Sequence, residues 1–240
     1  MFTNPFVLDN TIPVLFFILT YISMNYLYGS KKFLSILRPD GKKHFGEIGA
    51  CSNLVKTIQC VVSLVALTYY YITDIRHGNY PNIAMRSIAM NYVAVEILSL
   101  IKAKKHYLRK DIAYHHYSGI FFGTMSFFVD FNQTKAAQML LVFLFIVSLC
   151  VPYMLYNTLK AYYKNVQWLR LPAILSYLLP LCFFVVYSIV QWKSNLSGNV
   201  LWFVLYWVPI APMLYTNYVS IKYFFKRKES YTQKNGNKKY

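Results

Sequence analysis

The chain alternates long apolar stretches with short polar segments. Seven stretches hold about 18 or more predominantly apolar residues, which is enough for a helix to cross the hydrocarbon core of a bilayer. They lie at 11–28, 54–71, 83–101, 112–129, 136–156, 171–192 and 200–221. No segment between them is long enough to bury a core of its own. The pattern therefore predicts an all-α, polytopic membrane protein with seven transmembrane helices. The first stretch lacks a basic leader and is too long for a signal peptide, so we expect it to be a true span.

The basic residues predict the orientation of these spans. The chain has 25 Lys and Arg against 8 Asp and Glu, a net charge of +17. They occur as short runs between apolar stretches, mostly after the first, third, fifth and seventh, whereas a nucleic-acid binder gathers them on one soluble face. We therefore expect no nucleic-acid partner. Because basic loops face the cytosol, the N-terminus is predicted to be luminal and the C-terminus cytosolic.

Two short motifs bear on the luminal side. Asn132-Gln-Thr and Asn195-Leu-Ser are glycosylation sequons, and both fall in loops predicted to be luminal, so Asn132 and Asn195 are glycosylation candidates. The four cysteines show no disulfide framework. No spacing of Cys and His suggests a zinc site, and we expect no metal.

A cluster of titratable residues lies inside the apolar stretches. Glu96 lies on the third stretch, and His115 and His116 lie on the fourth. Such side chains are costly in hydrocarbon and commonly mark a functional site. A helical hairpin returns them to the same depth, roughly 8–9 Å below the cytosolic boundary. Because adjacent helical residues point about 100° apart, we expect one histidine to face Glu96 and the other to look elsewhere.

This trio can transfer protons. A carboxylate holds an imidazole in one tautomer, which suits the activation of a hydroxyl or amine for acyl transfer, or an acyl group carried on the imidazole itself. The same residues also fit a simple interhelical hydrogen bond, worth about 1–2 kcal/mol. A metal site is a further, weaker reading. Tyr114 and Tyr117 flank the histidines, and we expect them to line a cavity.

The stretch from Glu96 through His115-His116 to Gly119 resembles the centre of the TLC domain, shared by ceramide synthases and the translocating-chain-associated membrane proteins. In that family an acidic residue near the end of one span is followed by a basic turn and a His-His pair about twenty residues on. A polar fifth span containing proline is also typical. Here Ser148, Pro152 and Asn157 occupy it, and the resemblance makes them candidates for a lipid cavity.

The resemblance implies a six-helix barrel formed by spans two to seven, with the first span outside it and a central cavity for a lipid chain. It divides the chain into an N-terminal span and basic loop (1–44), a TLC-like membrane domain (45–225) and a basic cytosolic tail (226–240). Ceramide synthases carry further acidic residues after the histidine pair, whereas this chain has none between Asp130 and Glu229. It is therefore more similar to the small TLC-domain proteins.

Two functions follow from the resemblance. One is a protein of the endoplasmic reticulum or another endomembrane that binds or regulates membrane lipids, with no cofactor. The alternative is a lipid acyltransferase with acyl-CoA as co-substrate, His115 or His116 as catalytic base or nucleophile, and Glu96 as the residue that orients it. A fatty-acid elongase is a third possibility, but its His-x-x-His-His box would need a histidine where Ile112 stands.

Overall fold

The computed structural model describes most of the chain up to residue 191 and parts of the C-terminal stretch. The described residues are 5–37, 39–104, 110–133, 135–163, 165–191, 193, 204, 206–208, 210–216, 218–219 and 222. All secondary structure among them is helical, so the expected all-α class is confirmed for this part of the chain.

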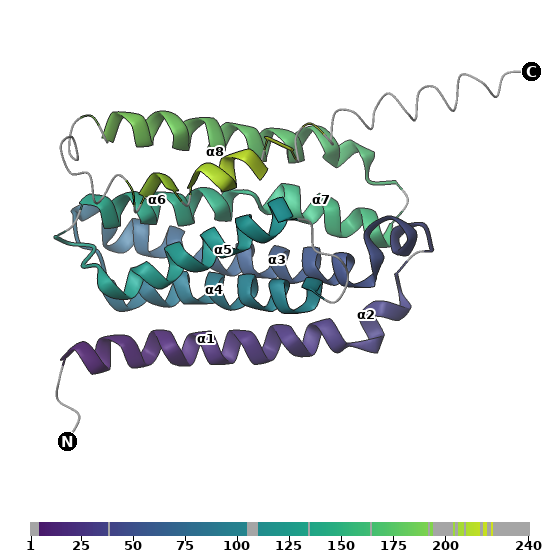
Figure 1. Cartoon of the computed structure of the whole chain (residues 1–240), viewed down its shortest axis with the longest axis horizontal. Helices are drawn as coiled ribbons and strands as arrows, with labels where there is room; N and C mark the ends of the chain where they lie inside the picture. Colours follow the sequence, from purple (N-terminus) through teal and green to yellow (C-terminus); the bar gives the residue numbers. More distant parts are fainter. Residues whose placement is uncertain are drawn as a thin grey trace, which may run out of the picture.

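Between residues 5 and 191 the described chain forms eight α-helices and three short 3₁₀ helices (Figure 1), and further helical residues lie at 206–208 and 210–216. The α-helices are α1 (Pro5–Gly29), α2 (Lys31–Ser35), α3 (Pro39–Thr73), α4 (Asn82–Lys104), α5 (Lys110–Met125), α6 (Lys135–Leu149), α7 (Val151–Tyr162) and α8 (Arg170–Gln191). The 3₁₀ helices are η1 (Ile75–His77), η2 (Ser126–Phe128) and η3 (Gln167–Leu169).

Five helical stretches of the described chain are long and apolar enough to cross a membrane. They are Asn10–Ser35, Glu47–His77, Asn82–Lys102, Gln138–Tyr162 and Gln167–Gln191. The chain is therefore a multi-pass membrane protein, but the predicted count of seven spans is not confirmed. The fourth predicted span is shortened because α5 has only 16 residues and gives way to η2. Much of the seventh, 200–221, lies outside the described residues.

The fifth span is broken into two helices, α6 and α7, which meet at Cys150. Proline has no N–H to donate and its ring crowds the preceding turn, so Pro152 favours a helix start rather than a helix interior. Pro152 indeed lies in the first turn of α7. Together the two helices still give a stretch of 25 residues from Gln138 to Tyr162.

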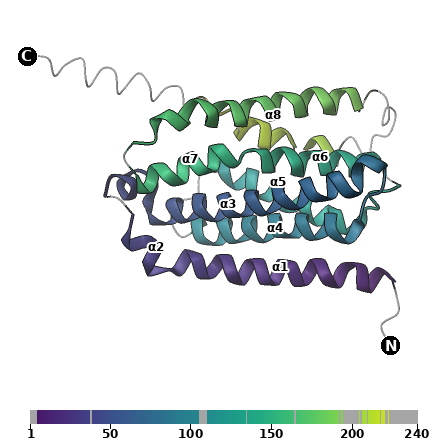
Figure 2. The ribbon, with the colours of Figure 1, turned by 180° about the vertical axis from the view of Figure 1, so that it is seen from behind.

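The helices pack side by side, with α1 along one edge of the bundle and α8 along the opposite edge (Figures 1 and 2). α1 packs mainly on α4; α4 also packs on α3 and α5, while α3 packs on α6 and α7 and these two on α8. Tyr206 and the helical residues that follow it, here called the Tyr206 segment, lie between α5 and α8. The ring of Tyr206 is 6.0 Å from the ring of Phe122 on α5 and 6.4 Å from the ring of Phe184 on α8. The contacts therefore run in a closed circuit from α3 through α4, α5, the Tyr206 segment, α8 and α7 back to α3.

Aromatic rings fill part of the space inside this circuit. Phe122, Phe143, Phe184 and Tyr206 belong to one buried cluster, and the Ser188 and Tyr206 hydroxyls lie 2.9 Å apart in a hydrogen bond. Between membrane helices such packing replaces the exclusion of water as the source of stability. Phe122 lies about 9 Å further along α5 than His116, so these rings pack to one side of the titratable residues.

Two glycines allow α5 to approach α4 closely. A Cβ atom at Gly119 would lie 2.8 Å from Tyr92 Cε1, and one at Gly123 would lie 2.1 Å from Val93 Cγ2. Small residues four apart on a membrane helix form a shallow face against which a neighbouring backbone can pack. This close approach brings the start of α5, with its two histidines, against the part of α4 that carries Glu96.

Candidate functional site

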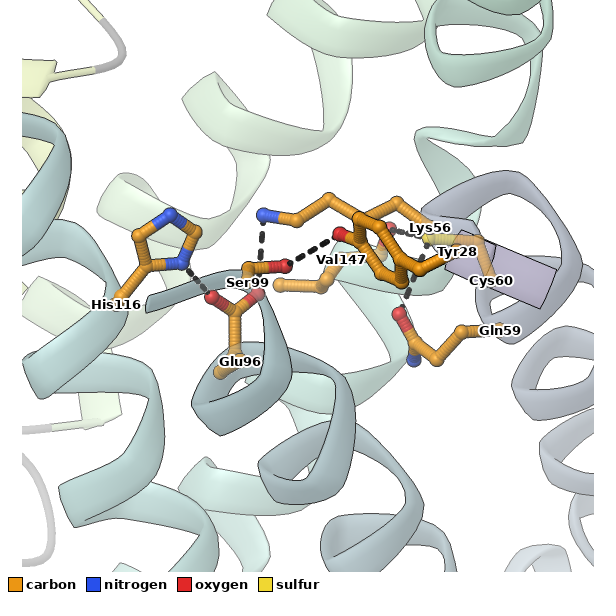
Figure 3. Close-up of polar contacts among 8 residues, drawn as sticks. All are labelled: Tyr28, Lys56, Gln59, Cys60, Glu96, Ser99, His116 and Val147. Atoms are coloured by element: carbon orange, nitrogen blue, oxygen red, sulfur yellow. Dashed lines mark hydrogen bonds and ion pairs between the residues drawn. The ribbon is translucent and has the colours of Figure 1, made fainter. Parts of the chain in front are cut away.

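Glu96 forms the centre of a buried polar cluster. It is 1% exposed and lies on α4, between α3 and α5. Its Oε1 atom is 3.2 Å from Lys56 Nζ on α3, and its Oε2 atom contacts His116 Nδ1 on α5 (Figure 3). The structure thus contains the contact between Glu96 and one histidine that the hairpin geometry predicts. We call Lys56, Glu96 and His116 the Glu96 cluster.

The contact with Glu96 sets the tautomer of His116. A carboxylate only accepts hydrogen bonds, so a neutral His116 donates its Nδ1–H and carries its free lone pair on Nε2. The second ring nitrogen points away from Glu96 in Figure 3. His116 is 4% exposed, which keeps the ring away from bulk water. A carboxylate that orients an imidazole in this way is the arrangement used in general acid–base catalysis.

His115 points in a different direction. Its ring centroid is 5.9 Å from that of His116, with the two planes at 86°. Its Nδ1 atom is buried and has no hydrogen-bond partner within the described part of the chain. Buried polar atoms are nearly always paired, so this unpaired nitrogen makes His115 a candidate for contact with a ligand.

Lys56 is the residue that sequence analysis missed. It lies two residues into the apolar stretch 54–71 and was not distinguished from that stretch. The available signal was the cost of a lysine inside a span, the same reasoning that identified Glu96. The lysine side chain is only 14% exposed and contacts Glu96.

The surroundings of the cluster are polar on the α3 side. Thr57 Oγ1 lies 2.9 Å from Thr158 Oγ1 on α7, and Asn91 of α4 donates to Ser63 Oγ at 3.2 Å. Gln59 also donates to Ser63, at 3.1 Å. Most polar atoms of this buried face are thus satisfied by each other, which fixes the rotation of α3 against α4 and α7.

α1 contributes polar contacts on the same flank through Tyr28. The hydroxyl of Tyr28 lies 3.4 Å from Ser99 Oγ, which is three residues after Glu96 on α4 (Figure 3). Tyr28 is 8% exposed. The first helix therefore covers the flank of α4 beside the cluster.

Two of the expected cavity residues lie on the outside of the bundle. Tyr114 is 59% and Tyr117 is 60% exposed, which corrects the expectation that they line an interior cavity. The reason is angular, because each lies about 200° around the helix from one member of the histidine pair. In a membrane these rings face lipid or the headgroup region.

The residues of the broken span are divided between interior and surface. Ser148 is buried, and its hydroxyl donates to Leu144 O at 2.8 Å within its own helix. Asn157 is partly buried, and Pro152 is exposed at the start of α7. Their expected place in a lipid cavity stays a prediction for Ser148 and Asn157, whereas Pro152 serves to break the helix.

The sequon residue Asn132 is held by a loop. Its Oδ1 accepts from Tyr80 N at 2.7 Å and its Nδ2 donates to Tyr80 O at 2.8 Å. Asp130 accepts from Asn82 Nδ2 at 3.0 Å and from Asn132 N at 2.9 Å. These bonds lower the pKa of the Asp130 carboxyl. The Asn132 amide, to which a glycan would be attached, is thus used to join two loops. Asn195 lies outside the described residues.

Arg86 ties the same end of α4 to the following turn. It is 7% exposed, and it donates through Nε to Ser126 O at 3.2 Å and through Nη2 to Val129 O at 3.1 Å. Ser126 begins η2 and Val129 directly follows it, so both carbonyls lie in the short segment after α5. The arginine is therefore a structural clasp for that segment.

Comparisons of the chain with protein-family models, with curated proteins and with solved structures give no significant match. Among the described residues, no group of three or more His, Cys, Asp or Glu side chains is placed to hold a metal ion. The function has to be inferred from the chemistry of the Glu96 cluster and its position between membrane helices.

Proposed function

We propose that the chain is a TLC-type protein of the endoplasmic reticulum or another endomembrane that binds and regulates membrane lipids. In this proposal the Glu96 cluster and His115 hold the polar part of a lipid. The observation that carries it is the buried Nδ1 atom of His115, which has no partner in the described chain although it adjoins the ionic Glu96 cluster.

The position of the cluster favours an amphiphilic ligand. Glu96 lies six residues before Lys102 on α4, which is about 9 Å along the helix axis. We expect a molecule that reaches His115 at this depth from the lipid to be largely apolar. His115 can donate or accept one hydrogen bond, which suits a hydroxyl, an amide or an ester carbonyl.

The packing of the helices supports the TLC reading of the fold. The closed circuit of α3, α4, α5, the Tyr206 segment, α8 and the α6–α7 pair has the order of a six-helix barrel, with α1 outside it. The luminal N-terminus and cytosolic C-terminus belong to the same proposal and rest on the basic loops.

Lipids that remain bound during purification in mild detergent test this function. Mass spectrometry of the wild type is compared with His115→Phe, which keeps a ring but removes both nitrogens, and with His77→Phe as the matched control in η1. We expect one lipid class to remain with the wild type and the His77 variant and to fall several-fold in the His115 variant. Equal lipid content in all three folded proteins would contradict the proposal.

A second function, acyl transfer, is favoured by the Glu96–His116 contact. In this reaction His116 Nε2 takes the proton of a hydroxyl or amine while that oxygen or nitrogen attacks the thioester carbonyl of an acyl-CoA. The acyl–sulfur bond breaks, and the departing thiolate receives the proton back from the imidazolium. Glu96 orients the ring throughout, and the basic end of the bundle offers charge complementary to the CoA phosphates.

Lipidomics of membranes that express equal amounts of the wild type, His116→Ala and the control His77→Ala distinguishes the two functions. Acyl transfer predicts that the amount of one lipid class changes when the wild type or the His77 variant is expressed. With a folded His116 variant that amount should equal the amount in membranes without the protein. A change that survives loss of His116 would exclude the base role and leave lipid binding.

A further inference from the structure

Glu96 has two cationic or potentially cationic neighbours. The Lys56 ammonium contacts one carboxylate oxygen at 3.2 Å, and His116 contacts the other. Figure 3 shows the two partners approaching the carboxylate from different helices, α3 and α5. The carboxylate is thus shared between a group that is always charged near neutrality and a group that is charged only when it binds a proton.

The charge balance of the cluster decides the state of His116. A buried carboxylate without a counter-charge is costly, and either neighbour can compensate it. Lys56 already gives one positive charge for one negative charge, so a further proton on His116 would leave the buried cluster with a net positive charge. The compensated state is therefore the one with a neutral imidazole.

The other titratable side chains around Glu96 do not alter this balance. Among the described residues they are Tyr28 from α1, Cys60 from α3, Tyr92 from α4 and His115 from α5. Tyrosine and cysteine are uncharged near neutrality, and a second protonated histidine would add to the excess of positive charge. Lys56 is the permanent cation in contact with Glu96.

We propose that Lys56 is a positioning residue that holds Glu96 as a carboxylate and thereby keeps His116 neutral, with its Nε2 lone pair available to a substrate or ligand. This rests on the proposed function, because it assigns Lys56 to the same site. It also assigns a purpose to a lysine inside a span. Removing its charge makes the cluster bind one more proton, on His116 or on Glu96, whereas a lysine with only a packing role would leave the protonation of both unchanged.

The protonation state is read directly from ¹⁵N NMR spectra of protein labelled at histidine, with assignments from His115→Gln and His116→Gln. At pH 7 the wild type is expected to show His116 as the neutral tautomer protonated on Nδ1. Lys56→Met keeps the length of the side chain but removes its charge, and its NMR spectrum is expected to show His116 as the imidazolium. If the extra proton binds Glu96 instead, the infrared spectrum shows the carbonyl band of a protonated carboxyl group. That band is absent from the double variant Lys56→Met/Glu96→Gln. Lys56→Arg should keep the wild-type state.

Lys102→Met is the matched control, since it removes a lysine near the end of the same bundle outside the cluster. A folded Lys56→Met protein with neutral His116 and no protonated Glu96 would overturn the proposal. An imidazolium signal from wild-type His116 at pH 7 would overturn it as well, and this measurement needs no variant of Lys56 to fold. Lys56→Gln is used if Lys56→Met does not fold.

The spectra are recorded without added lipid, so they test Lys56 whether or not the chain handles lipids. Lipid retention by wild-type protein from the same preparations tests the proposed function separately. If the wild type retains no lipid but the spectra show the expected protonation states, the proposed function fails and the role assigned to Lys56 stands.

Discussion

Replacing Gly123 by alanine should force α4 and α5 apart. The new Cβ atom would lie 2.1 Å from Val93 Cγ2 and 3.1 Å from the carbonyl oxygen of Ala89. Carbon atoms in contact prefer about 3.5–4.0 Å, so the first contact is short by roughly 1.5 Å. Because the second contact is with backbone, a change of the Val93 rotamer alone does not relieve the crowding. Overpacking of this kind costs about 1–3 kcal/mol.

The assay is thermal unfolding of the purified protein in detergent. For a chain of this size each kcal/mol corresponds to about 2–4 °C, so the variant should unfold several degrees lower than the wild type. Gly29→Ala is the matched control, since nothing lies within 4 Å of a Cβ at Gly29 in α1. Its unfolding temperature should be unchanged or slightly higher, because alanine favours helix.

A double-mutant cycle identifies the clash as the cause. Val93→Ala removes the methyl group that the new Cβ meets, so Gly123→Ala should cost clearly less in that background than alone. The reasoning is refuted if Gly123→Ala unfolds at the same temperature as Gly29→Ala. It is also refuted if Gly123→Ala lowers the unfolding temperature equally in the wild-type and Val93→Ala backgrounds. Separation of the helices should also weaken the contact of His116 with Glu96, which ¹⁵N spectra would show.

The remaining predictions concern the end of the bundle where α5 gives way to η2. Arg86→Met should lower the unfolding temperature by several degrees, because two buried carbonyls lose charged donors worth about 1.5–3 kcal/mol each; no change in thermal unfolding would show that the clasp is dispensable. The pKa of Asp130 is lowered in the folded chain by its bonds from Asn82 and the backbone N–H of Asn132. The contribution of Asp130 to the stability of the fold is therefore present above the unfolded pKa of about 3.9 and is lost as pH falls through the folded pKa. The hydrogen-exchange protection factors of 126–133, which are corrected for the intrinsic pH dependence of exchange, should therefore fall in acid, and Asn82→Ala should raise the pH at which they do so. Asn132 should remain unglycosylated, because its Nδ2 is bonded to Tyr80 O; a glycosidase-sensitive mobility shift that disappears in Asn132→Gln would contradict this.

The sequence was sufficient where the answer depended on distance along a helix. Glu96 and His116 lie at similar distances from one basic turn, so their meeting followed from the hairpin alone. The break of the fifth span at Pro152 was not predicted, although a proline inside a helix is a known cause of one. The sequence did not show in which direction each side chain points around α5, and Tyr114 and Tyr117 accordingly lie on the outside rather than in a cavity.

Lys56 could not be assigned a partner from the sequence for a different reason. It is forty residues from Glu96, and their contact depends on how α3 is rotated against α4. That rotation is set by the buried polar contacts of α3 with α4 and α7, none of which is visible in a pattern of apolar and polar letters. The end of α5 at Met125 was missed because Ser126–Phe128 reads as a continuation of the apolar stretch.

The contact between Lys56 and Glu96 has a consequence for biosynthesis. α3 and α4 precede α5 in the chain, so both charges can enter the bilayer before His116 leaves the ribosome to pair with Glu96. An isolated charge costs about 2.5–3.5 kcal/mol at the centre of an inserting helix and less toward its end. If α3 and α4 leave the translocon as a hairpin, the two charges enter lipid already neutralised by each other. We expect a fragment ending after α4 to insert efficiently with both residues or with neither, and poorly with only one. Lys56 would then serve the insertion of the chain before it serves the finished site.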